Sequence, residues 1–215
     1  MKSNNETEIK LRVTDVPALL RRLKKLKAQQ IFTRTHEFNT LYDTPKKNLH
    51  RQGQLIRVRV EQPASRASQK HEPPRTEAKL TYKGPAQNKS KSARTPGQPR
   101  YKVKEEFELT LSDGERMRRI LSALGLRPSF LYEKFRTTYV LKGHRDLKIE
   151  FDETPIGTFL ELEGSPAAIN RAAKLLGYVP SQYITETYGG LYIAHSRRVG
   201  SKPTNMLFST TKKSR

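Results

Sequence analysis

The sequence has 215 residues, an apolar fraction of 34% and 42 basic against 21 acidic side chains, so its formal net charge is +21. The absence of cysteine excludes disulfides and thiolate metal sites, leaves carboxylate, histidine and water as metal ligands, and fits a cytoplasmic location. No apolar run reaches the length of a membrane span and the N-terminus lacks the apolar core of a signal peptide, so we expect no contact with a membrane.

Most of the excess positive charge lies in three stretches that are rich in Pro, Ser, Gly and Gln. Residues 62–76, 84–102 and 196–215 together carry +13 of the +21. Such a composition is typical of segments that stay outside a folded core. We therefore expect one domain over residues 1–195, with mobile basic loops at about 62–76 and 84–100, followed by a basic, disordered tail over 196–215.

Taken in chain order, the hydrophobic spacing predicts eight strand segments and four helices. The strands are expected at 6–13, 31–43 (as one or two strands), 55–61, 77–83, 101–111, 132–141, 147–152 and 158–164. The helices are expected from Thr14 or Asp15 to about Ala28, from a capping box of Ser112 and Glu115 to Leu124, from Ser165 to Leu176, and from Ser181 to Tyr188.

Each predicted strand has one apolar face and one face that carries charged residues. In the first strand Glu6, Glu8 and Lys10 lie opposite Ile9 and Leu11. Scattered charge is ordinary on the solvated face of a sandwich, but neighbouring like charges repel one another unless a ligand or opposite charges neutralise them. Because such clusters recur along the chain, we favour a mainly antiparallel β fold with helices (α+β), in which eight strands close into a barrel with a charged lumen and helices pack on the outside.

Seven charged motifs follow one another along the chain. They are Glu6-Thr7-Glu8-Ile9-Lys10, Arg57-Val58-Arg59, Lys79-Leu80-Thr81-Tyr82-Lys83-Gly84-Pro85, Glu106-Phe107-Glu108, Lys134-Phe135-Arg136, Asp152, and Phe159-Leu160-Glu161-Leu162-Glu163-Gly164. In this order the sequence resembles the CYTH family of triphosphate tunnel metalloenzymes, which includes class IV adenylate cyclases, thiamine triphosphatases and inorganic triphosphatases. The resemblance runs over about residues 4–193 and is nearest to the class IV adenylate-cyclase-like branch.

The resemblance implies two sets of site residues. The metal side would be formed by Glu6, Glu8, Asp152, Glu161 and Glu163, with Glu106 and Glu108 as further candidates. The triphosphate would be held by Lys10, Arg57, Arg59, Lys79, Lys83, Lys134 and Arg136, of which Lys79 and Lys134 are the candidate catalytic residues. Carboxylates suit hard ions, so the expected cofactor is Mg²⁺ or Mn²⁺. Each residue could instead form a structural ion pair in the lumen, and for Glu106 and Glu150 the two interpretations are evenly balanced.

The nearest branch implies conversion of ATP to cyclic AMP and pyrophosphate. The alternative is hydrolysis of inorganic tripolyphosphate, thiamine triphosphate or a nucleoside triphosphate, because both reactions need the same phosphate and metal contacts. A weaker hypothesis of another class is a polyanion- or nucleic-acid-binding module that uses the basic loops and tail. A homodimer is left open. Tyr42, Tyr82 and Tyr188 could lie near the site, although a tyrosine on a strand or helix is more often a core residue. The five histidines show no metal-ligand spacing.

Overall fold

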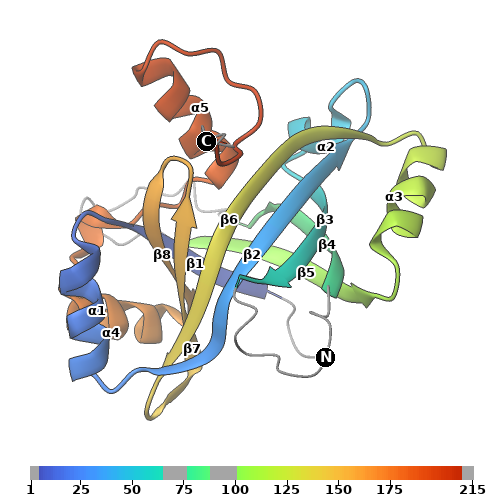
Figure 1. The fold of residues 1–215 in the computed structure, drawn as a ribbon. Coiled ribbons are helices and arrows are strands. Elements are labelled where there is room, and N and C mark those ends of the chain that lie inside the picture. The colour runs from blue at the N-terminus through green and yellow to red at the C-terminus, as the bar shows by residue number, and fades with distance from the viewer. Residues whose placement is uncertain (1–4, 65–76, 88–100, 210–215) are drawn as a thin grey trace, which may run out of the picture.

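The computed structural model describes residues 5–64, 77–87 and 101–209, and its eight strands form a closed antiparallel barrel (Figure 1). The strands are β1 (Asn5–Val13), β2 (Gln29–Asp43), β3 (Leu55–Pro63), β4 (Glu77–Ala86), β5 (Lys102–Leu111), β6 (Arg127–Leu141), β7 (His144–Thr154) and β8 (Gly157–Gly164). They pair in the cyclic order β1-β5-β4-β3-β2-β6-β7-β8. The predicted barrel is therefore confirmed.

The two predicted basic loops begin later than the sequence suggested. Strand β3 continues to Pro63 and β4 continues past Gly84 and Pro85 to Ala86, so both strands include residues that we had assigned to loops. The remainder of these loops, 65–76 and 88–100, lies outside the described residues.

Closure of the barrel decides which face of each strand is enclosed. In β1, Ile9 and Leu11 are fully buried on the outer side of the sheet, whereas Glu8 and Lys10 line the interior. Lys10 lies directly opposite Glu161 of β8 in the register. Because side chains alternate with a period of two, one register fixes the whole inner face of a strand pair.

Two helices cover the apolar outer face of β1, β7 and β8 (Figure 1). Helix α1 (Val16–Lys25) is capped by Asp15, and helix α4 (Pro166–Leu176) is capped by Ser165, as predicted. The core between them and the sheet includes Ile9, Leu11, Leu19, Leu23, Ile149, Leu160, Leu162 and Ile169. This core holds the charged inner face of β1 and β8 in place from behind.

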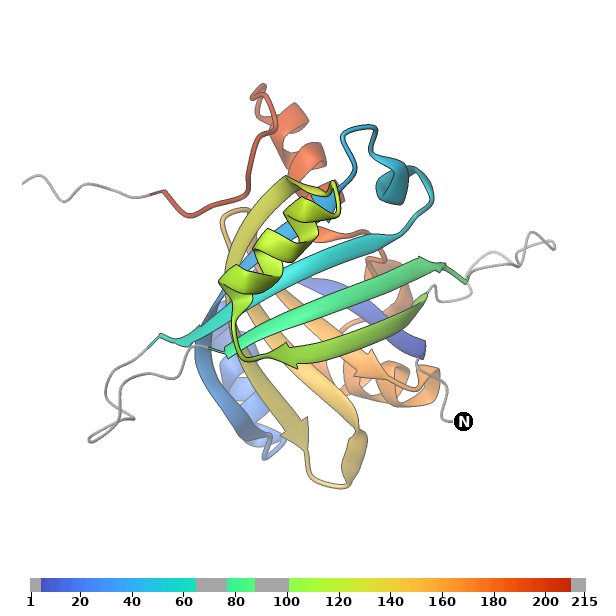
Figure 2. The same cartoon turned by 90° about the vertical axis from the view of Figure 1, so that its right-hand side faces the viewer.

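Helix α3 (Gly114–Ala123) lies against β3 on another side of the barrel (Figure 2). Its Leu121 belongs to the same buried apolar cluster as Val58 of β3. The predicted capping box of Ser112 is wrong, because Asp113 is the N-cap and its carboxylate accepts a hydrogen bond from a backbone amide of the first turn at 2.8 Å. A helix start needs only one such acceptor, and Asp113 supplies it one residue later.

Helix α2 (Asn48–Arg51) is a single turn that the sequence analysis did not predict. Asp43 at the end of β2 holds it, because its carboxylate accepts backbone hydrogen bonds from Thr44, Leu49 and His50 at 2.7, 3.0 and 2.9 Å. The connection between β2 and α2 is thus stabilised by a single buried carboxylate.

The predicted helix over residues 181–188 is wrong. The structure has one 3₁₀ turn, η2 (Pro180–Gln182), followed by extended chain in which Ile184 forms two backbone hydrogen bonds with Lys10, at 2.8 and 2.9 Å. Strand β5 pairs with β1 only as far as Glu8, so the backbone of Lys10 would otherwise lack partners on that edge. Pairing across the barrel therefore overrides the local helix signal.

Helix α5 (Tyr188–Arg198) begins where the predicted helix was expected to end. Thr187 caps it by accepting a hydrogen bond from the backbone of Gly190 at 3.1 Å. In the described part of the chain, no helix is both long and apolar enough to cross a membrane.

The chain beyond α5 packs back onto the barrel, which corrects the predicted disorder for residues 196–209. Met206 is fully buried beside Tyr132, donates a backbone hydrogen bond to Leu131 and accepts one from Glu133, both at 3.0 Å. Residues 210–215 of the predicted tail lie outside the described residues. Asn205 and Phe208 add contacts on either side, since Asn205 accepts a backbone hydrogen bond from Leu131 at 3.0 Å and the ring of Phe208 packs against Phe135.

Replacement of Met206 by Ala is expected to lower the free energy of unfolding by about 2–4 kcal/mol, because a buried methionine is replaced by a cavity. Chemical denaturation measures this difference. Leu207→Ala is the matched control, since Leu207 is 39% exposed and should change stability by less than about 1 kcal/mol. Equal effects of the two substitutions would contradict the burial of Met206.

Candidate active site

The barrel encloses a cavity of about 1390 Å³ that all eight strands line with charged side chains. The cavity is lined by every residue that we placed at the site except Asp152, namely Glu6, Glu8, Lys10, Arg57, Arg59, Lys79, Lys83, Glu106, Glu108, Lys134, Arg136, Glu161 and Glu163. The structure therefore brings these residues together in one space. The charged faces of the strands are enclosed, and the alternative of a solvated sandwich face is excluded.

Glu6 is an acid whose charge is poorly balanced. Lys83 Nζ lies 2.5 Å from Glu6 Oε2 and 2.7 Å from Glu106 Oε2, so one ammonium serves two carboxylates. Burial, together with a hydrogen bond to Glu106, raises the pKa of Glu6 to about 7 although Lys83 opposes the shift. A further cation beside this pair would relieve the repulsion between the two carboxylates.

Glu8 on the same strand has the opposite surroundings. Its Oε1 lies 3.3 Å from Lys10 Nζ and also contacts Lys102, while Lys10 reaches Glu161 Oε1 at 3.0 Å. Burial disfavours the charge of Glu8, but Lys10 and Lys102 outweigh it and hold the pKa of Glu8 below its usual range. Glu8 is therefore ionised at neutral pH.

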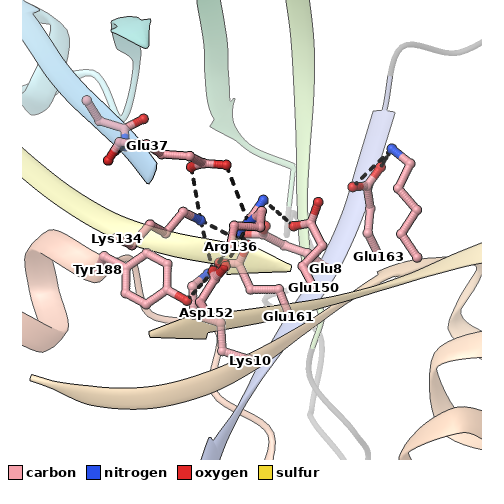
Figure 3. A network of polar contacts seen from close by, with 12 residues as sticks. Glu8, Lys10, Glu37, Lys134, Arg136, Glu150, Asp152, Glu161, Glu163 and Tyr188 are labelled. Carbon is pink, nitrogen blue, oxygen red and sulfur yellow. Dashed lines mark hydrogen bonds and ion pairs between the residues drawn. The ribbon is translucent and has the colours of Figure 1, made fainter. Parts of the chain in front are cut away.

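A second cluster lies where β6 meets β7 and β8 (Figure 3). Arg136 Nε lies 2.7 Å from Asp152 Oδ1, and Lys134 Nζ lies 2.8 Å from Asp152 Oδ2. Arg136 also contacts Glu150 and Glu161. Two bases are thus held among three acids at close range.

Glu37 of β2 completes this cluster and was missed by the sequence analysis. Its carboxylate lies 3.3 Å from Arg59, 3.5 Å from Lys134 and 3.7 Å from Arg136. Burial opposes its ionisation, but these three cations hold the pKa of Glu37 below its usual value. The signal that could have found it is an acidic residue in the otherwise weakly charged strand segment 31–43.

The two candidate catalytic lysines lie in different surroundings. Lys79 Nζ is 3.2 Å from Glu61, and its side chain is 22% exposed, whereas the side chain of Lys134 is 3% exposed. Glu163 likewise faces a base, with Lys148 Nζ at 3.2 Å. The structure thus gives Lys79 the more open position and Lys134 the more enclosed one.

Arg57 differs from the other buried bases because its guanidinium is under-satisfied. One nitrogen donates to Thr81 at 2.9 Å, another to the hydroxyl of Tyr132 at 3.4 Å, and the nearest carboxylate contact is Glu108 at 3.7 Å. Its buried Nε has no hydrogen-bond partner within the described residues. An incompletely paired guanidinium in an enclosed space is suited to receive an anion.

A family model for the CYTH domain matches residues 4–178. The chain belongs to the CYTH domain family. The match covers β1 to β8 and α4, which form the charged lumen and its supporting core.

Relatives of this CYTH protein agree with the assignment. A protein of Methanocaldococcus jannaschii that is named as a candidate adenylate cyclase is 27% identical over 172 residues, covering 80% of this chain and 83% of the relative. A solved structure of a candidate adenylate cyclase from Vibrio parahaemolyticus has a TM-score of 0.65 at 19% identity and covers 85% of this chain and 94% of its own. An adenylyl cyclase candidate from Hippeastrum, described as having a dominant triphosphatase activity, has a TM-score of 0.54 at 17% identity, over 92% and 97% of the two chains.

The donor set of the CYTH barrel fits a hard divalent ion. Within residues 5–64, 77–87 and 101–209, no three acidic or histidine side chains converge as a ready-made metal site. The close pair of Glu6 and Glu106 nevertheless offers carboxylate oxygens whose charge is incompletely neutralised. Mg²⁺ commonly binds one or two carboxylates and takes its remaining ligands from water and substrate phosphates, so these residues suit it.

Asp152 lies behind Lys134 and Arg136, two of the bases predicted to bind phosphate. It is fully buried, and its oxygens accept hydrogen bonds from Lys134, Arg136 and the hydroxyl of Tyr188. Its role as a metal ligand therefore stays a prediction, and the structure gives it a second role as an anchor of cations.

The stability of the metal-free CYTH barrel is expected to depend on pH through Glu150. Burial raises the pKa of Glu150 to about 8, while Arg136 opposes the shift and Glu161 adds to it. An acid with a raised folded-state pKa contributes stability that is complete below its ordinary pKa and is lost as the pH rises through about 8.

The measurement is the melting temperature of the wild type and of Glu150→Gln, both in EDTA, at pH 5 and pH 9. The advantage of the wild type over Glu150→Gln should shrink by several degrees between these two values, because the glutamine stays neutral. An advantage that is constant or grows with pH would contradict the shifted pKa.

Proposed function

We propose that this protein is a Mg²⁺- or Mn²⁺-dependent enzyme that binds the triphosphate group of its substrate in the lumen of the barrel. The observation that carries the proposal is the enclosed cavity with its seven candidate phosphate-binding bases, among which Arg57 has a buried Nε with no hydrogen-bond partner in the described part of the chain. A triphosphate needs several fixed cations along its length, and guanidinium groups bind phosphate oxygens in pairs.

The charge balance of the cavity supports a requirement for metal. Although the whole chain carries +21, the cavity is lined by twelve acidic and eleven basic side chains. A triphosphate entering this nearly neutral space alone would meet carboxylates that no base could then neutralise. Glu6, Glu8 and Glu106 would hold divalent ions that enter with the substrate, which would leave the bases free to bind the phosphates.

The residues of the chain divide this work. Four bases would hold phosphate oxygens and fix the direction of the triphosphate, namely Arg57, Arg59, Lys134 and Arg136. Two acids, Glu6 and Glu8, would hold the ion, with Glu106 nearby. The bound ion would polarise a phosphoryl oxygen and neutralise the charge that develops in the transition state. Enclosure in the barrel strengthens each of these electrostatic contacts relative to bulk water.

Two reactions are compatible with this arrangement. Cyclisation of ATP, in which the ribose 3′-hydroxyl attacks the α-phosphorus and pyrophosphate leaves, is our first assignment because of the name of the Methanocaldococcus relative. Hydrolysis by an activated water is the second assignment, and the triphosphatase activity described for the Hippeastrum protein favours it. In both cases the same bases hold the triphosphate.

The test is incubation of the purified protein with ATP, tripolyphosphate or thiamine triphosphate, each with Mg²⁺ or Mn²⁺, followed by separation of cyclic AMP, pyrophosphate and phosphate. We expect turnover of at least one triphosphate and its loss in EDTA. Absence of turnover with every substrate would sink the proposal. Cyclic AMP supports the first assignment, and phosphate release supports the second.

A further inference from the structure

Tyr188, the first residue of α5, is buried in the wall of the cavity and contacts the cluster that contains Lys134 and Asp152 (Figure 3). Its hydroxyl donates a hydrogen bond to Asp152 Oδ2 at 2.6 Å. Its ring centre lies 5.2 Å from Lys10 Nζ and 5.1 Å from Lys134 Nζ. One side chain therefore contacts two predicted phosphate-binding lysines and the acid that anchors one of them.

Asp152 transmits the position of Tyr188 to the bases. Besides Tyr188, its oxygens accept hydrogen bonds from Lys134 at 2.8 Å and from Arg136 at 2.7 and 2.6 Å. Asp152 is fully buried and does not line the cavity, whereas Lys134 and Arg136 do. The carboxylate thus holds both bases from behind, while their side chains line the lumen.

A purely structural role does not require the hydroxyl of Tyr188. The ring already packs in an apolar cluster with Tyr132, Phe159 and Met206, and a phenylalanine would fill the same space. Burying a hydroxyl costs free energy unless it is hydrogen-bonded, and here its partner is a carboxylate that already holds two cations. The hydroxyl is therefore placed to orient the carboxylate of Asp152, which holds Lys134 and Arg136.

We infer that Tyr188 is a positioning residue for triphosphate binding, which sets Asp152 through its hydroxyl and so aligns Lys134 and Arg136 with the phosphates, while its ring packs beside the ammonium groups of Lys10 and Lys134. The inference rests on the proposed function. Tyr188 touches no reacting atom in this arrangement. Its contacts should strengthen the binding of the substrate and of the transition state equally, because both contain the phosphate oxygens that Lys134 and Arg136 hold.

The first experiment compares steady-state kinetics of the wild type and Tyr188→Phe with the substrate that the wild type turns over. We expect KM to rise about tenfold while kcat changes less than about threefold, since loss of uniform binding raises KM alone. A merely structural role would lower the fraction of active molecules and hence kcat, and leave KM unchanged. Tyr183→Phe is the matched control, because it removes a tyrosine hydroxyl that donates to Asn170 at 3.0 Å outside the cavity.

The second experiment tests whether Tyr188 acts through Asp152. In a double-mutant cycle, Tyr188→Phe should raise KM by less than about twofold when Asp152 has already been replaced by Asn. The carboxylate through which the hydroxyl of Tyr188 acts is then already absent. Additive effects of the two substitutions would overturn the inference. Thermal unfolding of each variant shows whether it is folded under the assay conditions.

The outcomes separate this inference from the proposed function. An active wild type with an unchanged KM in Tyr188→Phe overturns the inference alone. A wild type that turns over no triphosphate overturns the proposed function and the inference with it. A raised KM in Tyr188→Phe, with Tyr183→Phe equal to the wild type, supports both.

Discussion

Replacement of both Glu6 and Glu8 by glutamine is expected to reduce turnover at least about 1000-fold, because the amides cannot supply the negative charge that a divalent ion requires. Glutamine keeps the size of each side chain, so the cavity should retain its shape. The effect should be large because Glu6 lies in a pair of incompletely neutralised carboxylates and Glu8 is held in its ionised form. Steady-state kinetics over a range of Mg²⁺ or Mn²⁺ concentrations measures it.

Glu105→Gln is the control for this double substitution. Glu105 is an exposed acid on β5, where it lies opposite Asn5 of β1, and it does not line the cavity. Its replacement removes one negative charge from the same region of the barrel and should leave turnover and the metal requirement unchanged. Wild-type activity in the double variant, with a folded barrel by circular dichroism, would refute the metal-side assignment.

Replacement of Arg57 by Met is expected to lower kcat/KM about 100-fold, and replacement by Lys about tenfold. The guanidinium donates to the neutral hydroxyls of Thr81 and Tyr132 and its nearest carboxylate contact is at 3.7 Å, so its charge remains available to phosphate oxygens. Lysine restores the charge but not the fork of donors, which explains the intermediate value. Kinetics with the substrate that the wild type turns over, together with calorimetric titration of tripolyphosphate, measures both losses.

The stability of these variants separates binding from folding. The buried Nε of Arg57 is unpaired within the described residues. The free energy of unfolding of Arg57→Met should therefore lie within about 1 kcal/mol of the wild-type value, or above it. Arg116→Met is the matched control for loss of an arginine, since the Arg116 side chain is 79% exposed on α3 and its replacement should change neither stability nor kinetics. A marked loss of stability in Arg57→Met, with unchanged phosphate affinity, would assign Arg57 to the fold.

The role of a charged residue in this barrel can be assigned only once its partners are known. Asp152 shares the sequence signature of a metal ligand, yet three neighbouring side chains occupy its oxygens. Glu37 shows no motif, yet it contacts three bases. Both cases depend on contacts between strands that are distant in the chain, and a pattern within one strand carries no information about them.

The amino-acid sequence by itself determined the charged inner faces of the strands, since strict alternation with a period of two separates apolar from charged residues locally. It also indicated the starts of α1 and α4, offering Thr14 or Asp15 as the cap of the first helix and Ser165 as the cap of the second. In the structure Asp15 and Ser165 are the caps.

Tertiary contacts alone decided the conformation of the segment from residue 180 to residue 209 and the pairing of charged residues in the barrel. Ile184 pairs with the free edge of β1, and helix α5 starts only at Tyr188. Met206 pairs with β6 although the segment before it, residues 200–205, is polar. These contacts join segments far apart in sequence, where burial and backbone hydrogen bonding outweigh local propensity. For the same reason, only the closed barrel shows which acid lies beside which base.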